Sequence, residues 1–291
     1  MLSSELIKLN NLQLAGKLVS DELLLGIHGS KRFGLGTEFE QYRHYEPGDD
    51  PKRIDWKLFA RTQKHLVRES ATESNFQIRL VLDLSGSMNY AEKEVSRLQY
   101  AKVLLASLAY LGYRQSDLLS LYSLQNGELQ KLVPSGKKAF ERILYALEKA
   151  EAHGIWQNAN PKFPEFQQKR DAARQKELVI IASDFLQVGD EWLKLIQNIA
   201  NPHREVVIFQ ILGKEELNFD LKGFYRFKDL ETGKEIELEA EAVKDDFRKS
   251  AEKYLTNLEE SLRIPNVHLI RTTLQEPIAS VITESLKKRK L

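Results

Sequence analysis

Asp83, Ser85 and Ser87 are the residues whose types and spacing are best suited to chemistry in this chain. They occur in the segment Asp83-Leu84-Ser85-Gly86-Ser87, directly after the apolar run 77–82. Alternate residues that leave a strand turn the same way, so one carboxylate and two hydroxyls should point to one position. Mg²⁺ prefers hard oxygen ligands in an octahedron and retains several waters. The pattern therefore predicts a divalent-metal site for Mg²⁺ or Mn²⁺.

A second carboxylate is expected from Asp184, which follows another short apolar run at 177–182. If both runs are strands of one doubly wound sheet, they lie side by side, and Asp184 ligates the metal directly or through water. Two hydroxyls with one or two carboxylates leave the metal under-neutralised. A carboxylate from another protein can then complete the shell. The pattern favours a binding device over a hydrolytic one.

The elements that must position these residues alternate between strand and helix from Phe76 onward. Such alternation predicts an α/β fold, a doubly wound, mostly parallel sheet with helices on both faces, whose ligands bind beyond the carboxyl ends of the strands. We expect strands at 77–82, 118–123, 177–182, 205–212 and 267–270, with 129–133 as a candidate partner of 118–123, and helices at 92–113, 137–150, 191–200, 242–262 and 277–288.

Two further segments are expected to add to this sheet domain. Residues 1–75 should form an N-terminal α+β extension that packs on the domain at 76–291, with helical spacing at 3–28, strands at 37–45 and 65–72, and a short helix at 54–61. Residues 224–240 should form an inserted β-hairpin around Glu231-Thr232-Gly233-Lys234. A long surface loop or lid is expected at 154–174.

Several motifs together resemble known protein families. Asp83-Leu84-Ser85-Gly86-Ser87-Met88 is similar to the metal-ion-dependent adhesion site of von Willebrand factor A domains. An upstream signature resembles the bacterial family called domain of unknown function fifty-eight, in which it precedes an A-type domain. That signature comprises Gly36-Thr37-Glu38-Phe39, Tyr42-Arg43, Tyr45-Glu46-Pro47-Gly48-Asp49-Asp50, Arg53-Ile54-Asp55-Trp56 and Ala60-Arg61. The segment 227–233 also looks like an insertion of that family.

The resemblance implies a protein that acts beside MoxR-type AAA+ ATPases, in complex assembly or chaperone-like work. Asp83, Ser85, Ser87 and Asp184 carry over as metal ligands. A-type domains also supply a Thr, which we expect in the loop at 133–137. That loop reads Val-Pro-Ser-Gly-Lys, without Thr. Ser135 is the residue there that can replace it, whereas Lys137 would bring an ammonium group and weaken metal binding.

The composition excludes several other classes of function. Lys and Arg total 43 against 42 Asp and Glu, so the net charge of +1 predicts no nucleic-acid partner. The chain has no cysteine, which excludes thiolate metal sites and cysteine nucleophiles. It has neither a Walker A motif nor an HExxH spacing of histidines. No signal peptide or apolar stretch of membrane-spanning length is evident, so we expect a cytoplasmic protein without a membrane span.

The leading interpretation is a non-catalytic module that binds a protein carboxylate through a metal, with an AAA+ ATPase or its client as the partner. One alternative is a Mg²⁺-dependent phosphohydrolase with Asp83 as nucleophile or ligand. Dehalogenase-type phosphatases carry a second Asp two residues after the nucleophile, where this chain has Ser85. The other alternative is a metal-free scaffold whose site has decayed, which the missing Thr keeps open.

Overall fold

The computed structural model describes residues 3–27, 41–45, 59, 63–64, 66–69, 76–126, 128–154, 177–186 and 191–289. Most of the upstream signature at 36–61, most of the predicted helix at 54–61 and most of the predicted loop at 154–174 lie outside these residues. Every statement below concerns the described part of the chain.

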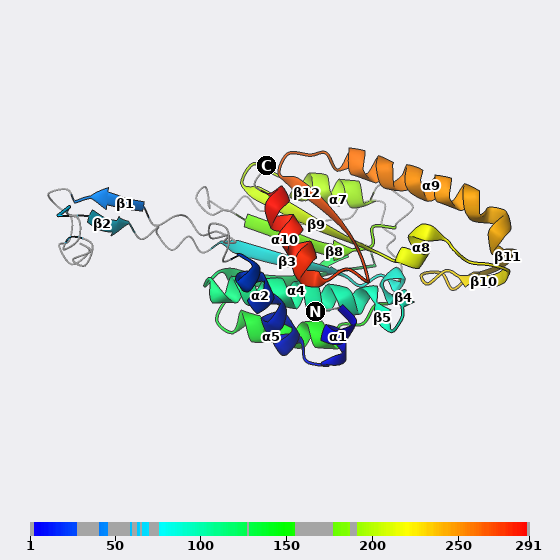
Figure 1. Cartoon of the computed structure of the whole chain (residues 1–291), viewed down its shortest axis with the longest axis horizontal. Helices are drawn as coiled ribbons and strands as arrows, with labels where there is room; N and C mark the ends of the chain where they lie inside the picture. The colour runs from blue at the N-terminus through cyan, green and yellow to red at the C-terminus, as the bar shows by residue number, and fades with distance from the viewer. Residues whose placement is uncertain are drawn as a thin grey trace.

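A six-stranded sheet forms the centre of the molecule (Figure 1). Its strands run in the order β12-β9-β8-β3-β6-β7, and all neighbouring pairs are parallel except β6 with β7. The strands are β3 (Gln77–Asp83), β6 (Leu118–Gln125), β7 (Glu128–Val133), β8 (Glu177–Ser183), β9 (Arg204–Leu212) and β12 (Val267–Thr273). The predicted fold class is confirmed, and 129–133 does pair with its candidate partner.

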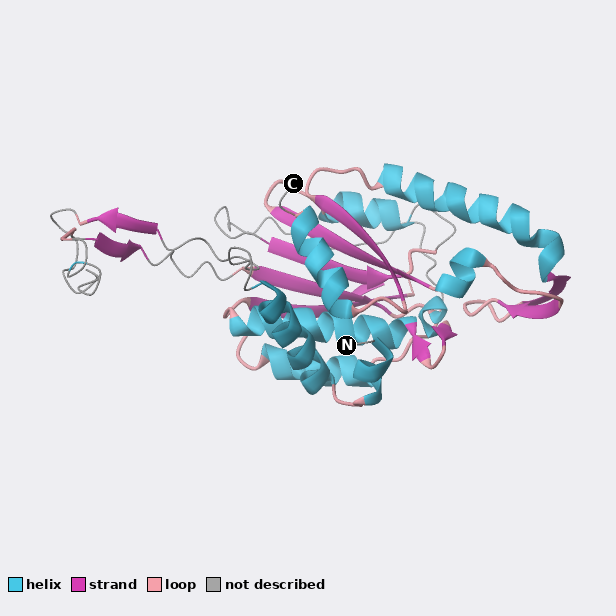
Figure 2. Ribbon diagram, in the orientation of Figure 1, coloured by secondary structure: helices cyan, strands magenta, loops and turns pink. Residues whose placement is uncertain are grey.

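Helices cover both faces of this sheet, as Figure 2 shows. Helices α4 (Arg97–Arg114), α5 (Ala139–Lys149) and α10 (Ile278–Lys288) share one core with the strands. On the other face, α7 (Glu191–Ile199) and the end of α9 (Ala240–Ser261) enclose a second core. Strands with apolar residues on both faces become buried on both sides, which is why β3 and β8 have almost no exposed residue.

The chain changes direction in the sheet at β3 and β8. From β3 it passes through α4 to β6 on one side, whereas from β8 it passes through α7 to β9 on the other. The carboxyl ends of β3 and β8 therefore flank the point where the strand order reverses, which is where open α/β sheets bind ligands.

An insertion between β9 and β12 covers the carboxyl edge of the sheet. It contains the short helix α8 (Lys214–Asn218), the hairpin of β10 (Phe224–Lys228) and β11 (Glu235–Glu239), and the helix α9. The predicted hairpin is thus present, with its turn at the predicted residues 231–234. The helix α8 was not predicted, because five residues give no measurable periodicity.

The N-terminal segment contributes helices that join the main core. Helices α1 (Ser3–Lys8) and α2 (Leu12–Ile27) pack against α4, and Leu6, Val19 and Leu23 lie in the same core as the sheet. The strands β1 (Gln41–His44) and β2 (Leu66–Glu69) pair antiparallel with each other (Figure 1). The division of the chain at residue 75 stays a prediction.

The helix predicted from residue 92 begins later, at Arg97. Strands β4 (Ala91–Glu92) and β5 (Val95–Ser96) form a small antiparallel pair before it, and a 3₁₀ helix (Gly86–Asn89) precedes them. Ser96 then caps α4: its hydroxyl accepts the Gln99 amide at 3.1 Å, while the Gln99 side chain accepts the Ser96 amide at 3.0 Å. This capping box sets where the helix starts. No described helix is long and apolar enough to span a bilayer.

Asp117, at the start of β6, should make the stability of the protein pH-dependent. Burial raises the pKa of its carboxyl to about 7, and Oδ2 is buried without a hydrogen-bond partner among the described residues. Between about pH 4 and pH 7 the folded protein keeps this proton, whereas the unfolded chain has released it. The free energy of unfolding therefore falls as the pH rises through this range. We expect Asp117→Asn to raise the melting temperature at pH 8 and to leave it nearly unchanged at pH 4.

Glu141→Gln provides the control for this prediction, because Glu141 is an exposed carboxylate on α5. Melting curves of both variants and the wild type at pH 4 and pH 8 give the comparison. An equal effect of Asp117→Asn at both pH values would contradict the assignment.

Candidate metal centre

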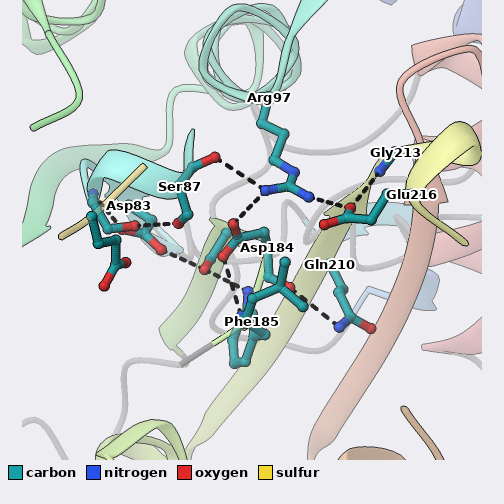
Figure 3. Close-up of polar contacts among 12 residues, drawn as sticks. Asp83, Ser87, Arg97, Asp184, Phe185, Gln210, Gly213 and Glu216 are labelled. Atoms are coloured by element: carbon teal, nitrogen blue, oxygen red, sulfur yellow. Dashed lines mark hydrogen bonds and ion pairs between the residues drawn. The ribbon is translucent and has the colours of Figure 1, made fainter. Parts of the chain in front are cut away.

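Asp83 and Asp184 lie at adjacent strand ends. Strands β3 and β8 pair in parallel, with Leu82 opposite Ala182, so Asp83 closes one strand and Asp184 directly follows the other. Both carboxylates are fully buried. The predicted side-by-side placement of the two strands is therefore present in the structure, and both acids lie at the switch point of the sheet (Figure 3).

The Asp83 carboxylate is held by groups from both strands. The Ser85 amide donates to Oδ1 at 2.8 Å, and the Ser183 hydroxyl donates to Oδ2 at 2.5 Å. Burial, followed by the charge of Asp184, raises the pKa of Asp83 to about 7. Two adjacent buried carboxylates thus raise the energy of the ionised pair, and a nearby cation would lower it.

The two predicted serine ligands come together on the same loop. The Ser85 and Ser87 hydroxyls lie 3.0 Å apart, with Ser85 buried and Ser87 half-buried. The loop is secured by the next segment of chain: the Gly86 amide donates to the Gly154 carbonyl at 3.0 Å, and the His153 amide donates to the Leu84 carbonyl at 2.9 Å. The hydroxyls are therefore held close together beside the Asp83 carboxylate.

Ser183 was not predicted, although it precedes Asp184 in the chain. Its hydroxyl donates to Asp83 and accepts the Phe185 amide at 3.0 Å. Phe185 adopts a left-handed backbone (φ 56°), a conformation that is uncommon for a bulky residue and ends the strand sharply. Its ring stacks on Trp192 at 4.0 Å, so packing supports the turn that positions Asp184.

Arg97 is the main site residue that the sequence did not reveal. Its guanidinium, in the first turn of α4, is almost completely buried and lies 2.8 Å from Asp184 Oδ2. It also donates to the Ser87 carbonyl at 3.1 Å and forms an ion pair with Glu216 of α8. Its Cζ lies 4.5 Å from the centre of the Tyr90 ring. Figure 3 shows the guanidinium bridging from Ser87 and Asp184 to Glu216.

The insertion adds a further acidic residue to this site. Glu231, in the turn of the β10–β11 hairpin, has its pKa raised by burial and then by the charges of Asp184 and Asp229, and the nearby Ser87 hydroxyl offsets part of this rise. Tyr254 of α9 donates to the Phe185 carbonyl, and burial with the charge of Asp184 raises its pKa to about 12. Long sequence separation hid these contacts, because no local pattern links residues 83–87 to residues 216–254.

The loop at 133–137 cannot take the place that we expected for it. Because β7 runs antiparallel to β6, with Val133 opposite Leu121, its end points away from the edge where Asp83 lies. Ser135 and Lys137 are exposed. The expectation that one of them replaces the missing Thr or repels the metal is therefore wrong. The segment that does flank the loop carrying Ser85 and Ser87 is Ala152–Gly154, through the contacts of His153 and Gly154 and a 2.7 Å bond from Asn89 to the Ala152 carbonyl.

The oxygen donors at this site fit a hard divalent cation, although Arg97 already pairs with one of the two carboxylates. Asp83, Ser85 and Ser87 offer oxygen atoms from one loop, and Asp184 offers a second carboxylate that Arg97 already neutralises in part. Within the described residues, no three acidic or histidine side chains cluster as a metal site of their own. Hydroxyl and carboxylate oxygens of this kind suit a cation that also accepts water ligands, as Mg²⁺ and Mn²⁺ do.

Comparisons with known proteins give the chain a family. A family model described as "Protein of unknown function DUF58" matches residues 41–257. Uncharacterized protein Rv1480 from Mycobacterium tuberculosis (strain ATCC 25618 / H37Rv) is 26% identical over 261 residues, which are 88% of this chain and 80% of that protein.

Two solved structures are similar at low identity. The conserved hypothetical protein BatB from Bacteroides thetaiotaomicron is 13% identical, with 74% of this chain and 98% of that chain covered and a TM-score of 0.45. The SpRpn10 VWA domain is 13% identical, with 72% and 94% covered and a TM-score of 0.40. Because the family model spans most of its length, the protein belongs to the family described as Protein of unknown function DUF58.

Proposed function

We propose that this protein is a non-catalytic, metal-dependent protein-binding module. The observation that carries the proposal is the meeting of Asp83 and Asp184, from neighbouring strands, with the Ser85 and Ser87 hydroxyls at the switch point of the sheet. A divalent cation there would have few charged ligands from the chain, and a carboxylate from a partner would complete its shell. We further propose a cytoplasmic MoxR-type AAA+ ATPase or its client as that partner, on the resemblance described above.

The roles of the chain's own residues follow from their contacts. Asp83 would hold the cation, and Ser183 and the Ser85 amide orient its carboxylate. Ser85 and Ser87 would supply neutral oxygens. Asp184 would act directly or through water, because both of its carboxylate oxygens already accept hydrogen bonds, from Arg97 and from the Leu186 amide. The position two residues after Asp83, where dehalogenase-type phosphatases carry a second Asp, is occupied by Ser85.

Replacing Asp83 tests the proposal. We expect the wild type to bind Mg²⁺ and Mn²⁺ and Asp83→Ala to bind them at least about a hundredfold more weakly, because even loss of an outer contact costs 10- to 100-fold in metal affinity. Isothermal calorimetry measures this, with Asp21→Ala as control, because Asp21 is a partly exposed acid on α2 that pairs with Arg114. Equal heats for wild type and Asp83→Ala would overturn the metal assignment.

The same pair of proteins separates binding from catalysis. A MoxR-type ATPase should be retained by immobilised wild type in Mg²⁺ and released by EDTA, and Asp83→Ala should not retain it. A phosphatase screen in Mg²⁺ should show no turnover. Turnover that Asp83→Ala abolishes would instead support the phosphohydrolase.

A metal-free binding module is the second candidate, and the Arg97–Asp184 ion pair favours it. The guanidinium lies 2.8 Å from Asp184 and supplies positive charge without a metal. In that case the carboxylate partner would bind to a preformed polar site, and calorimetry would show no heat of Mg²⁺ binding for the wild type. EDTA would then leave partner binding unchanged.

A further inference from the structure

The turn of the β10–β11 hairpin lies directly against the loop that carries Ser85 and Ser87. A Cβ atom added at Gly86 would be 2.5 Å from the Leu230 carbonyl oxygen, so only glycine allows the two backbones to approach this closely. The next residue, Glu231, lies near the Ser87 hydroxyl. The insertion therefore delivers a carboxylate to one of the two hydroxyls that would hold the cation.

Glu231 differs from its neighbours in the turn by its burial. Every other residue from Lys228 to Glu237 is exposed, whereas Glu231 is half-buried. Burying the one carboxylate of an otherwise exposed turn costs free energy unless a hydrogen bond or an opposite charge compensates it. A cation bound at the neighbouring Ser87 hydroxyl would compensate this cost.

The turn is also built to hold Glu231 in place. The Asp229 carboxylate accepts the Glu231 amide at 2.9 Å and the Thr232 hydroxyl, and the Asp229 amide donates to the Lys234 carbonyl at 2.8 Å. Gly233 takes the left-handed backbone (φ 72°) that closes the turn. Hydrogen bonds of this kind fix a turn locally.

The hairpin is anchored to the rest of the insertion close to its turn. Phe227 stacks on Phe219 with ring centres 5.8 Å apart, and Phe219 stacks on Phe247 of α9 at 4.4 Å. Helix α8, which precedes the hairpin, is tied to the site by the ion pair between Glu216 and Arg97. These contacts hold β10 against α8 and α9 and hold α8 against Arg97, so the segment that carries Glu231 is supported on the side of the site.

We propose that Glu231 is a ligand supplied in cis, which takes the position on the cation that a partner carboxylate would otherwise occupy. The site is then closed by its own chain at rest, and a partner gains access by displacing the hairpin turn. This inference rests on the proposed metal-dependent function. It adds a residue outside the strand-end motif and a competition between Glu231 and the partner.

Mn²⁺-loaded protein offers a direct test, because water-proton relaxation reports how many waters the bound Mn²⁺ carries. We expect Glu231→Gln to weaken Mn²⁺ binding about tenfold and to add about one bound water, since a charged ligand is lost from the shell. Glu235→Gln is the matched control: it makes the same change on the same hairpin, at an exposed carboxylate.

A second pair of variants moves the turn while Glu231 is retained. Asp229→Ala removes the acceptor that holds the Glu231 amide. It should therefore increase the water-proton relaxation caused by bound Mn²⁺, as Glu231→Gln should. Asp229→Asn loses the same charge but keeps an acceptor oxygen, and should behave like the wild type.

The outcomes separate the two proposals. If wild type and Glu231→Gln bind Mn²⁺ equally and relax water equally, Glu231 is not a ligand, and the metal site itself stands. If the wild type binds no Mn²⁺, both the cis ligand and the proposed function are overturned.

Discussion

Replacing Arg97 by methionine is expected to lower the free energy of unfolding of the metal-free protein by about 3 to 5 kcal/mol, the usual effect of removing one partner from a buried ion pair. The substitution leaves Asp184 without the guanidinium at 2.8 Å, and Glu216 without its ion pair. Asp184 already lies beside the Asp83 carboxylate, so the loss places two buried acids together with no compensating cation. Urea unfolding in EDTA, followed by tryptophan fluorescence, measures the change.

Mg²⁺ should restore part of this loss. A cation held by Asp83 and the two serines supplies the positive charge that Arg97 provided, and saturation at 100 times the dissociation constant stabilises a protein by about 2.7 kcal/mol. The metal-free candidate predicts no recovery, so the same titration also discriminates between the two proposed modes of binding.

Arg226→Met is the control for Arg97, because it breaks an exposed ion pair. Arg226 contacts Glu237 at 2.5 Å, but both side chains are about two-thirds exposed, and such pairs contribute about 0.2 to 1 kcal/mol. If Arg97→Met changed the stability no more than Arg226→Met, the buried ion pair would not be needed to hold the site together.

Replacing Glu177 by alanine is the second substitution with a large expected effect, about 3 kcal/mol of lost stability. Glu177 begins β8 at the amino edge of the sheet, where its carboxylate contacts two buried arginines. Oε1 lies 2.8 Å from Arg79 of β3, and Oε2 lies 2.6 Å from Arg204 of β9. Its removal takes away the negative charge that both guanidinium groups share. Urea unfolding measures the effect.

The position of Glu177 makes a further comparison possible. It lies at the opposite end of β8 from Asp184, so Glu177→Ala should leave Mn²⁺ affinity unchanged while stability falls. Glu284→Ala breaks an exposed pair with Lys288 one helical turn apart, and should alter stability by less than about 0.5 kcal/mol. A loss of Mn²⁺ binding in Glu177→Ala would show that the two ends of the sheet are coupled.

The strand–helix order of the sheet and the placement of Asp83 could be predicted because both follow from local patterns. Apolar runs at 77–82 and 177–182 give strands buried on both faces, and parallel strands bring their carboxyl ends to one edge. Asp184 follows from the same reasoning. The hairpin at 224–240 could be predicted from its turn residues, Glu231-Thr232-Gly233-Lys234.

Arg97, Glu216 and Glu231 could not be predicted, because their meeting depends on the path of the chain between β9 and β12. Charged residues at such positions usually face solvent, and nothing in their immediate sequence distinguishes them from that majority. The error about the loop at 133–137 has a related origin. The direction of β7 decides which edge of the sheet that loop reaches, and short apolar runs carry no information about strand direction.

The insertion that carries Glu231 has a consequence for how such chains can diverge. Strands β9 and β12 pair directly, with Val206 opposite Val267 and Leu212 opposite Thr273, although the whole segment from Gly213 to Asn266 separates them in sequence. The entropy of closing a loop grows only slowly with its length, about 0.6 kcal/mol for each doubling. The segment between β9 and β12 can therefore lengthen, shorten or change its tip with little effect on the register of the sheet. Relatives that keep the acids at the ends of β3 and β8 can therefore vary the insertion that covers them, and with it the partners that can reach the site.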